Sequence, residues 1–179
     1  MRGGIIILEG QNITLKGLEY HQLPILKEWM NDFEIAKKLL RIEPSITYFT
    51  EKWYNSFQND RTKLIFSIND RLSDKFIGCI GVNNIEFIDK KGELYIYIGD
   101  RSYWNRGYAF EALKIIMDYL FNYYNLNKLY LNVRADNQNA IKLYNKVGFK
   151  IEGKFRNDKF IEGKYIDIIR MAMLKDEYI

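Results

Sequence analysis

Apolar residues recur along this chain with two periods, and these periods predict its secondary structure. Runs typical of strands, bounded by polar turns, cover residues 13–18, 63–69, 76–86, 93–99, 129–134, 149–155 and 165–174. Helical spacing covers residues 23–31, 33–40, 50 or 51 to 58, a long segment ending at Tyr124 and a short one that includes Tyr144. Residues 41–50 are expected to be irregular, because Pro44 forces Glu43 to be extended.

The connections between these elements predict the fold class. The early strands are joined by polar turns at residues 70–74 and 89–92, which suit antiparallel hairpins. The later strands alternate with helices, which suits parallel crossovers. We therefore expect a mixed α/β fold in which helices flank one sheet. The length suits a single domain over residues 1–179.

Composition and charge narrow the class of protein. Hydrophobic residues make up 47% of the chain and aromatic residues 16%, enough for a sizeable core. The net charge of +4 is too small to indicate nucleic-acid binding. The apolar run at residues 5–8 is too short for an export signal or a membrane span. We expect a cytoplasmic protein with neither a nucleic-acid nor a membrane partner.

The chain has one cysteine and one histidine, and neither predicts chemistry. Cys79 lies in the apolar run 76–82, so we expect a buried thiol that is a poor nucleophile and forms no internal disulfide. His21 lies at a helix start and is expected to be a surface capping residue. No second His or Cys is available to build a metal site with it.

Residues 103–114 join the strand 93–99 to a strongly amphipathic helix. Such a turn directs unpaired backbone N–H groups and the positive end of the helix dipole at one point, where an anion such as phosphate can bind. Gly107 allows close backbone approach, and Arg101 and Arg106 can add positive charge. By itself the segment also fits an ordinary helix start.

A second segment, residues 136–149, follows the strand 129–134 and predicts a short capped helix. Asp136 or Asn137 is a good N-cap, and Gly148 is a good helix stop. Positions 137, 140, 141 and 144 fall on one helical face, so an amide and a phenol line the same groove. Tyr144 alone would fit simple aromatic packing, but the anion turn upstream favours a binding groove.

Together these segments resemble the acetyl-CoA-binding core of the GNAT N-acetyltransferases, in the branch of ribosomal-protein N-terminal and spermidine N-acetyltransferases. Residues 103–112 are similar to the branch's glycine-rich turn, 140–149 to its Tyr-x-Lys-x-Gly-Phe ending and 152–171 to its closing hairpin. The resemblance covers roughly residues 76–174. In one departure, Asn105 replaces the first glycine of the turn, although Asn tolerates left-handed backbone.

The resemblance implies a fold, a co-substrate and a mechanism. The fold would be GNAT-like, with a largely antiparallel sheet of about six to seven strands. Acetyl-CoA would be the co-substrate, without a metal, and the amine would attack it directly in a ternary complex. Tyr144 would protonate the departing thiolate, and a backbone N–H near the end of strand 93–99 would meet the oxyanion. The implied acetyl-CoA contacts are Ile98, Arg101, Trp104, Asn105, Arg106, Gly107, Tyr108, Ala109, Asn137, Ala140, Tyr144 and Lys146.

Glu93 is the first candidate for the base that deprotonates the amine. Strand alternation places Glu93, Tyr95 and Tyr97 on one face, opposite Leu94, Ile96 and Ile98. Glu93 equally fits a solvated charge at a strand start, and water could relay the proton instead.

The resemblance leaves the acceptor open between a small-molecule amine, either a polyamine or a nucleotide-linked amino sugar, and a peptide N-terminus. Its cleft is expected from the early helices, the loop 43–49 and the hairpin 157–164. The available side chains are Glu34, Glu43, Tyr48, Trp53, Tyr54, Tyr95 and Tyr97. Nearby lysines match the acids, which argues against a polyamine site.

Two other readings of function differ in class, and the oligomeric state is open. A non-catalytic sensor that binds acetyl-CoA or another nucleotide would retain the fold without turnover. A flavin or nicotinamide dinucleotide binder is disfavoured, because no Gly-x-Gly-x-x-Gly follows an early strand. An exposed strand edge or aromatic surface could support a homodimer.

Overall fold

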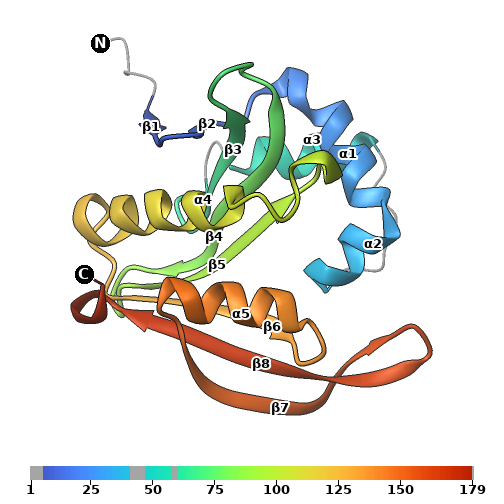
Figure 1. Ribbon diagram of the computed structural model, residues 1–179, viewed down its shortest axis with the longest axis vertical. Helices are drawn as coiled ribbons and strands as arrows, with labels where there is room; N and C mark the ends of the chain where they lie inside the picture. The colour runs from blue at the N-terminus through green and yellow to red at the C-terminus, as the bar shows by residue number, and fades with distance from the viewer. Residues whose placement is uncertain (1–5, 41–46, 58–59, 179) are drawn as a thin grey trace.

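The computed structural model describes residues 6–40, 47–57 and 60–178, without the side chains of residues 47–49. Within these ranges eight strands form one sheet in the order β1-β2-β3-β4-β5-β6-β8-β7 (Figure 1). The strands are β1 (Ile7–Glu9), β2 (Ile13–Gly17), β3 (Leu64–Asp70), β4 (Phe76–Glu86), β5 (Lys91–Ile98), β6 (Lys128–Arg134), β7 (Lys150–Ile161) and β8 (Lys164–Leu174). The α-helices are α1 (Leu23–Asn31), α2 (Phe33–Ala36), α3 (Thr47–Ser56), α4 (Tyr108–Asp118) and α5 (Gln138–Val147).

The sheet is mixed and largely antiparallel, which confirms the predicted fold class. The pair β5–β6 is parallel, and the other six pairs of neighbouring strands in the described ranges are antiparallel. The strand count exceeds the prediction by one, because Ile7–Glu9 pairs with β2. Three residues are too few to show the alternation of apolar and polar positions that identifies a strand in a sequence. Only the pairing with β2 identifies this segment as a strand.

Several boundaries differ from the predicted ones, including that of the helix predicted over 33–40, whose α-helical part ends at Ala36. Helix α3 begins at Thr47, inside the segment expected to be irregular, whereas residues 41–46 lie outside the described part. Helix α4 ends at Asp118 and continues as a π-helical turn, Tyr119–Tyr123. Strand β7 continues to Ile161, where a turn at Gly163 reverses the chain into β8. Helix ends and long hairpins depend on tertiary pairing, which local patterns represent poorly.

Apolar side chains pack on both faces of the sheet, and the alternation of β5 is confirmed. Leu94 joins the core beneath α4 and α5, where Leu113 and Ile116 have no exposed surface and Ile96 and Ile98 pack at its margin. The opposite face packs against α1 and α3 in a smaller cluster of buried and partly buried residues. That cluster contains Leu18, Leu23, Leu26, Trp29, Met30, Trp53, Tyr54, Ile65, Phe76, Cys79 and Tyr97.

Candidate active site

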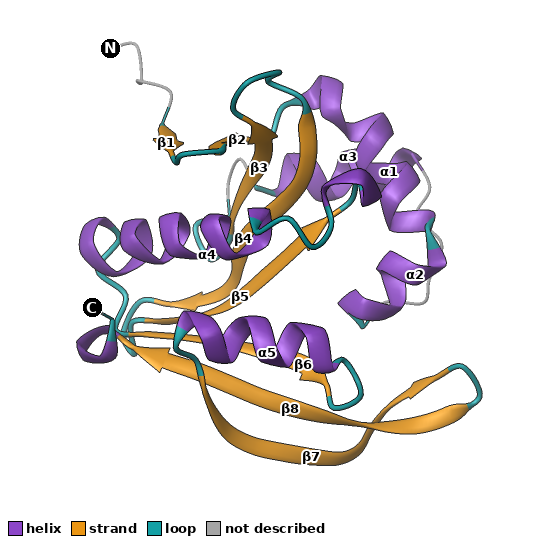
Figure 2. Cartoon of the chain, in the orientation of Figure 1, coloured by secondary structure: helices purple, strands orange, loops and turns teal. Residues whose placement is uncertain are grey.

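Strands β5 and β6 separate midway along their length and open the sheet (Figure 2). Their ladder ends at the pair Glu93–Tyr130, while β5 continues to Ile98 beside β4. The Gly99 N–H points to β4, where it donates to Ile77 O at 2.8 Å. Because backbone groups alternate in direction along a strand, the N–H groups of Ile96 and Ile98 point into the gap. The gap therefore offers backbone donors to a bound ligand.

A cleft of about 1100 Å³ occupies this gap. Its volume is at the upper end of the range for small-molecule sites, so it has room for a large ligand. The cleft is lined by β5, by the turn before α4, by α5 and by the β7–β8 hairpin. From the predicted site it includes Glu93, Ile98, Trp104, Asn105, Gly107, Tyr108, Ala109, Asn137, Ala140 and Tyr144.

The turn before α4 has the geometry of an anion site. Asn105 has φ 59° and Gly107 has φ 86°, so the prediction that Asn105 adopts left-handed backbone is confirmed. The Trp104 indole N–H donates to Ile98 O at 2.8 Å and fixes the turn against β5. The first backbone hydrogen bond of α4 runs from Glu111 N to Gly107 O at 3.0 Å. The N–H groups of residues 108–110 therefore have no acceptor within the helix.

The space beside Gly107 is open, and a Cβ built there meets no atom within 4 Å. Three predicted cofactor contacts lie outside the cleft lining, and all three are exposed. Arg101 pairs with Asp32 at the α1–α2 junction. The Lys146 Nζ lies 4.9 Å from the Phe110 ring centroid, and Arg106 is exposed on the turn itself. The turn thus offers backbone donors to an anion, and Lys38, whose Nζ lies 4.1 Å from the Trp104 ring centroid, adds a cation to the cleft lining beside it.

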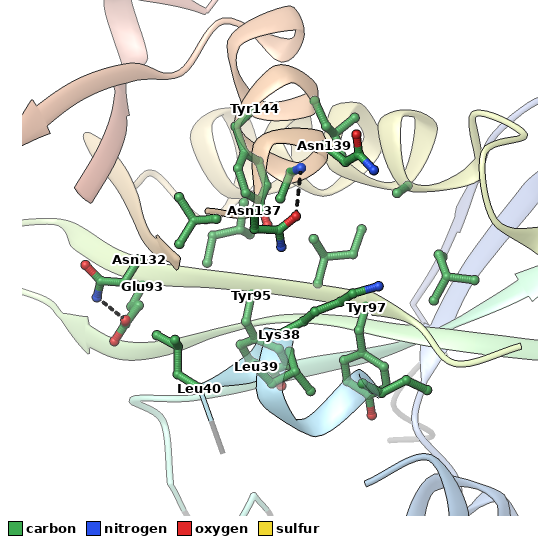
Figure 3. Close-up of a pocket in the computed structure, with 18 of the residues that line it drawn as sticks. Lys38, Leu39, Leu40, Glu93, Tyr95, Tyr97, Asn132, Asn137, Asn139 and Tyr144 are labelled. Carbon is green, nitrogen blue, oxygen red and sulfur yellow. Dashed lines mark hydrogen bonds between the residues drawn. The ribbon is translucent and has the colours of Figure 1, made fainter. Parts of the chain in front are cut away.

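Helix α5 carries Tyr144 into the cleft. Its N-cap is Asn137, whose Oδ1 accepts from Ala140 N at 3.3 Å, and Gly148 with φ 116° ends it, as predicted. Figure 3 shows Tyr144 extending from α5 toward β5. Burial raises the pKa of the Tyr144 phenol to about 12. Among the described residues none forms a hydrogen bond with its hydroxyl, so that group is available to a ligand.

Glu93 lies where β5 and β6 separate, and two neutral amides hold its carboxylate. Asn84 Nδ2 donates to Glu93 Oε2 at 3.0 Å. Asn132 Nδ2 donates to Glu93 Oε1 at 2.7 Å, as Figure 3 shows. Asn132 in turn accepts from Arg170 Nε at 3.2 Å. Neither Asn132 nor Arg170 could be predicted from the sequence, because only strand pairing brings Asn132 to Glu93 and Arg170 to Asn132.

The expected acceptor residues divide into three groups. Tyr95 and Tyr97 line the cleft on the side of β5 away from α5 (Figure 3). Trp53 lines the cleft as well. Glu34 and Tyr54 do not line the cleft. The Glu34 carboxylate pairs with Lys37 Nζ at 2.7 Å, and the Tyr54 ring packs edge-on against Tyr20 with 6.0 Å between the ring centroids. Glu43 lies outside the described residues, and the side chain of Tyr48 is not described.

Cys79 and His21 take no part in the site. The Cys79 thiol is fully buried, and burial raises its pKa to about 12, as expected for a poor nucleophile. His21 is exposed and lies 3.1 Å from Glu19. In the described ranges, no three His, Cys, Asp or Glu side chains form a cluster that could hold a metal. None of the described helices is long and apolar enough to span a membrane.

Relatives of known sequence match nearly the whole chain. The spermidine N(1)-acetyltransferase of Escherichia coli K12 is 32% identical, and the match covers 94% of this chain and 89% of that protein. An uncharacterized N-acetyltransferase, p20, from Bacillus licheniformis is 30% identical, with 94% and 96% covered. The match thus extends well beyond the two motif segments.

A solved structure shows the same fold. The spermidine N-acetyltransferase of Vibrio cholerae, solved with CoA and spermine, has a TM-score of 0.88 and 29% identity, covering 94% of this chain and 99% of that one. The acetyltransferase (GNAT) domain family matches residues 12–150, which include the turn, Glu93 and Tyr144. The chain therefore belongs to the GNAT acetyltransferase family and is an acetyl-CoA-dependent N-acetyltransferase.

Proposed function

We propose that this enzyme transfers the acetyl group of acetyl-CoA directly to the primary amine of a small molecule, within a ternary complex. The observation that carries the proposal is the gap between β5 and β6. It joins the anion turn and Tyr144 on one face of the sheet to Glu93, Tyr95 and Tyr97 on the other. Two substrates can enter from opposite faces and meet beside the backbone donors of β5.

Each step of the transfer has a candidate group. Glu93 accepts a proton from the ammonium form of the acceptor, and the neutral nitrogen then attacks the thioester carbon. A backbone N–H of β5 that points into the gap stabilises the oxyanion. When the carbon–sulfur bond breaks, Tyr144 gives its proton to the CoA sulfur. The attacking nitrogen, which is positively charged after the attack, releases its extra proton to solvent as the amide forms. The amide product and the free thiol then leave, Glu93 gives its proton to solvent, and the Tyr144 phenolate takes a proton back from solvent.

The cofactor would bind along the turn and α5. Its pyrophosphate would accept from backbone N–H groups between Trp104 and Tyr108, where the helix dipole adds positive potential. The open space at Gly107 fits a phosphate that approaches the backbone closely. Asn137, Ala140 and Tyr144 would line the pantetheine arm.

For the acceptor we propose an aliphatic polyamine as the first class to test, because spermidine acetyltransferases match this chain over nearly its whole length. An amino sugar is the second class. It is favoured by the aromatic lining from Trp53, Tyr95 and Tyr97, which suits stacking on a sugar or base face. Lys38, Lys159 and Arg170 also line the cleft, against the acids Glu93 and Asp158. That balance is less favourable for a long polycation than a carboxylate-rich cleft would be.

Thiol release with acetyl-CoA and an acceptor panel tests this function. The panel contains spermidine, spermine, a nucleotide-linked amino sugar and a peptide with a free N-terminus. We expect release with at least one small-molecule amine, and mass spectrometry should find the acetylated product. Acetyl-CoA binding by calorimetry without release on any acceptor would instead indicate a sensor. Release with the peptide alone would overturn the small-molecule assignment.

We further propose that residues 1–179 act as one catalytic domain and that the protein self-associates. A Vibrio cholerae relative with a TM-score of 0.83 and 29% identity has been solved as a dodecamer. Strand β7 is an edge strand with Ile151 and Phe155 exposed, which suits contact with a second copy. Light scattering on the purified protein should give a mass that is a multiple of 21.4 kDa.

A further inference from the structure

The carboxylate of Glu93 is held by neighbours from strands on both sides of β5. Asn84 reaches it from β4, where a register shift between Asn83 and Glu86 and a φ of 51° at Asn84 interrupt the regular ladder. Asn132 reaches it from β6. Asn132 lies two residues beyond Tyr130, which pairs with Glu93 at the end of the β5–β6 ladder. Both donors are neutral, so they orient the carboxylate without neutralising it.

The amide of Asn132 has one orientation that satisfies all its neighbours. Arg170 lies directly opposite Asn132 in the β6–β8 register, and a guanidinium can only donate. The Asn132 oxygen must therefore face Arg170 Nε, at 3.2 Å, which leaves its NH2 group facing Glu93. A flipped amide would set donor against donor on one side and oxygen against carboxylate on the other. Arg170 thus fixes the donor and acceptor directions of the hydrogen bonds that run from Arg170 through Asn132 to Glu93.

Arg170 itself is fixed by two aromatic rings. Its guanidinium carbon lies 4.7 Å from the Tyr130 ring centroid and 5.3 Å from the Phe155 ring centroid. Stacking of this kind holds a guanidinium in place, because its planar cation is attracted to the ring faces. The Arg170 guanidinium therefore bonds to Asn132, which lies between it and Glu93, and forms no ion pair with the Glu93 carboxylate.

We propose that Asn132 is a positioning residue: held by Arg170, it orients the Glu93 carboxylate toward the acceptor amine. This inference rests on the proposed function, in which Glu93 is the base. Asn132 lines the cleft, but in the proposal it acts only through Glu93. Its effect should therefore disappear when Glu93 can no longer accept a proton.

A double-mutant cycle tests this dependence. Asn132→Leu keeps the approximate shape of the side chain but removes both hydrogen bonds, and kcat should fall roughly ten- to a hundredfold, because the base loses its orientation. In the background of Glu93→Gln, the same substitution should lower kcat no further. Asn122→Leu is the matched control, because Asn122 also donates to a carboxylate, that of Asp118 on the surface of α4. It should leave kcat unchanged.

The outcomes separate this inference from the function on which it rests. Unchanged kcat in Asn132→Leu, with a large loss in Glu93→Gln, would overturn the positioning role and leave Glu93 as the base. Unchanged kcat in Glu93→Gln would remove the base assignment itself. Additive losses in the double variant would mean that Asn132 acts by another route. Acetyl-CoA binding by calorimetry confirms that each variant is folded.

A second variant gives a pH signature that a purely structural role would not produce. Asn132→Asp places a second carboxylate against Glu93, and two carboxylates at hydrogen-bond distance cannot both ionise readily. Glu93 interacts electrostatically with Tyr130, on which Arg170, Glu86 and Lys91 also act, and these four side chains are unchanged in the variant. The acidic limb of the kcat/KM profile should move to higher pH by about one unit or more. An unmoved limb would overturn the proposal, and Asn122→Asp is its control.

Discussion

At the scale of single residues, the environment of each side chain in the cleft decides what it can do. The Tyr144 phenol is desolvated, which raises its pKa to about 12 from an ordinary value of 10.0. Burial favours the neutral form, so Tyr144 keeps its proton over the neutral and mildly alkaline range. Its contribution to stability is therefore fully present below pH 10 and is lost as the pH rises through the folded value of about 12. If the pH profile of kcat had an alkaline limb below pH 10, that limb would come from the titration of a group other than Tyr144.

Tyr144→Phe should separate the acid from the packing. The ring keeps its edge-on contact with Phe149, whose centroid is 6.0 Å away, and only the proton donor is lost. Because general acid catalysis is typically worth about a hundredfold or more, kcat should fall by roughly that factor. The melting temperature should change little. A variant with full turnover and rate-limiting chemistry, or a loss confined to the melting temperature, would leave Tyr144 with a packing role only.

Glu93→Gln should lower turnover mainly at low pH, where deprotonation of the amine without help is hardest. Binding of acetyl-CoA should be spared, because Glu93 lies on the face of β5 away from the turn. The measurement is a pH profile of kcat/KM beside calorimetry with acetyl-CoA. Glu152→Gln is the control, because Glu152 is a surface carboxylate that pairs with Lys128. A profile identical to that of the parent would assign the proton to water or to another carboxylate.

At the scale of elements, the turn before α4 combines two left-handed residues within three positions. Asn105 and Gly107 have φ values of 59° and 86°, a conformation that costs little for Asn and less for Gly. The backbone therefore curls so that the first N–H groups of α4 face the cleft. The element works through its main chain, so the side chain of Asn105 need not contact the ligand.

Gly107→Val should weaken acetyl-CoA binding roughly tenfold or more, since even one lost hydrogen bond to a phosphate is worth that much. The branched side chain would occupy the open space where the pyrophosphate is expected. Gly163→Val is a matched control: Gly163 has φ 77° and also has no atom within 4 Å of a built Cβ, but it lies in the β7–β8 turn. Calorimetry compares the two variants. If the two variants bound acetyl-CoA with equal affinity, any loss of affinity relative to the parent would come from backbone strain and not from exclusion of the phosphate.

At the scale of the whole molecule, the sheet serves as core and as scaffold for the cleft. Helix α4 begins at the turn and buries Leu113 and Ile116 against the strands that carry Leu94 and Leu129. The position of the turn therefore depends on the packing of the same helix into the core. Stability and cofactor binding are coupled through this one element.

Leu113→Ala should lower the free energy of unfolding by about 2–5 kcal/mol, because it leaves a cavity in a well-packed core. Leu113 has no exposed surface, whereas Leu72, in the turn between β3 and β4, is 98% exposed. Leu72→Ala should therefore change stability by less than about 0.5 kcal/mol. Urea unfolding measures both variants. A small effect of Leu113→Ala would mean that α4 contributes little to the cooperative core.

The sequence by itself determined the features that depend on neighbours along the chain. Periodicity placed the strands and helices, the residue types at 105 and 107 predicted the left-handed turn, and Asn137 and Gly148 predicted the ends of α5. Helical phase put Tyr144 on the same face as Ala140, and both line the cleft. These features are local, because the spacing of residues within one turn or one strand sets their physical cause.

Only the tertiary structure decided which distant residues meet. Pairing with β2 makes a strand of Ile7–Glu9, and Arg101 pairs with Asp32 instead of lining the cleft. Strand register brings Asn132 and Arg170 beside Glu93 from positions far along the chain. Register depends on the packing of the whole sheet, and a shift of one residue would turn each of these side chains to the opposite face. No local pattern contains that information.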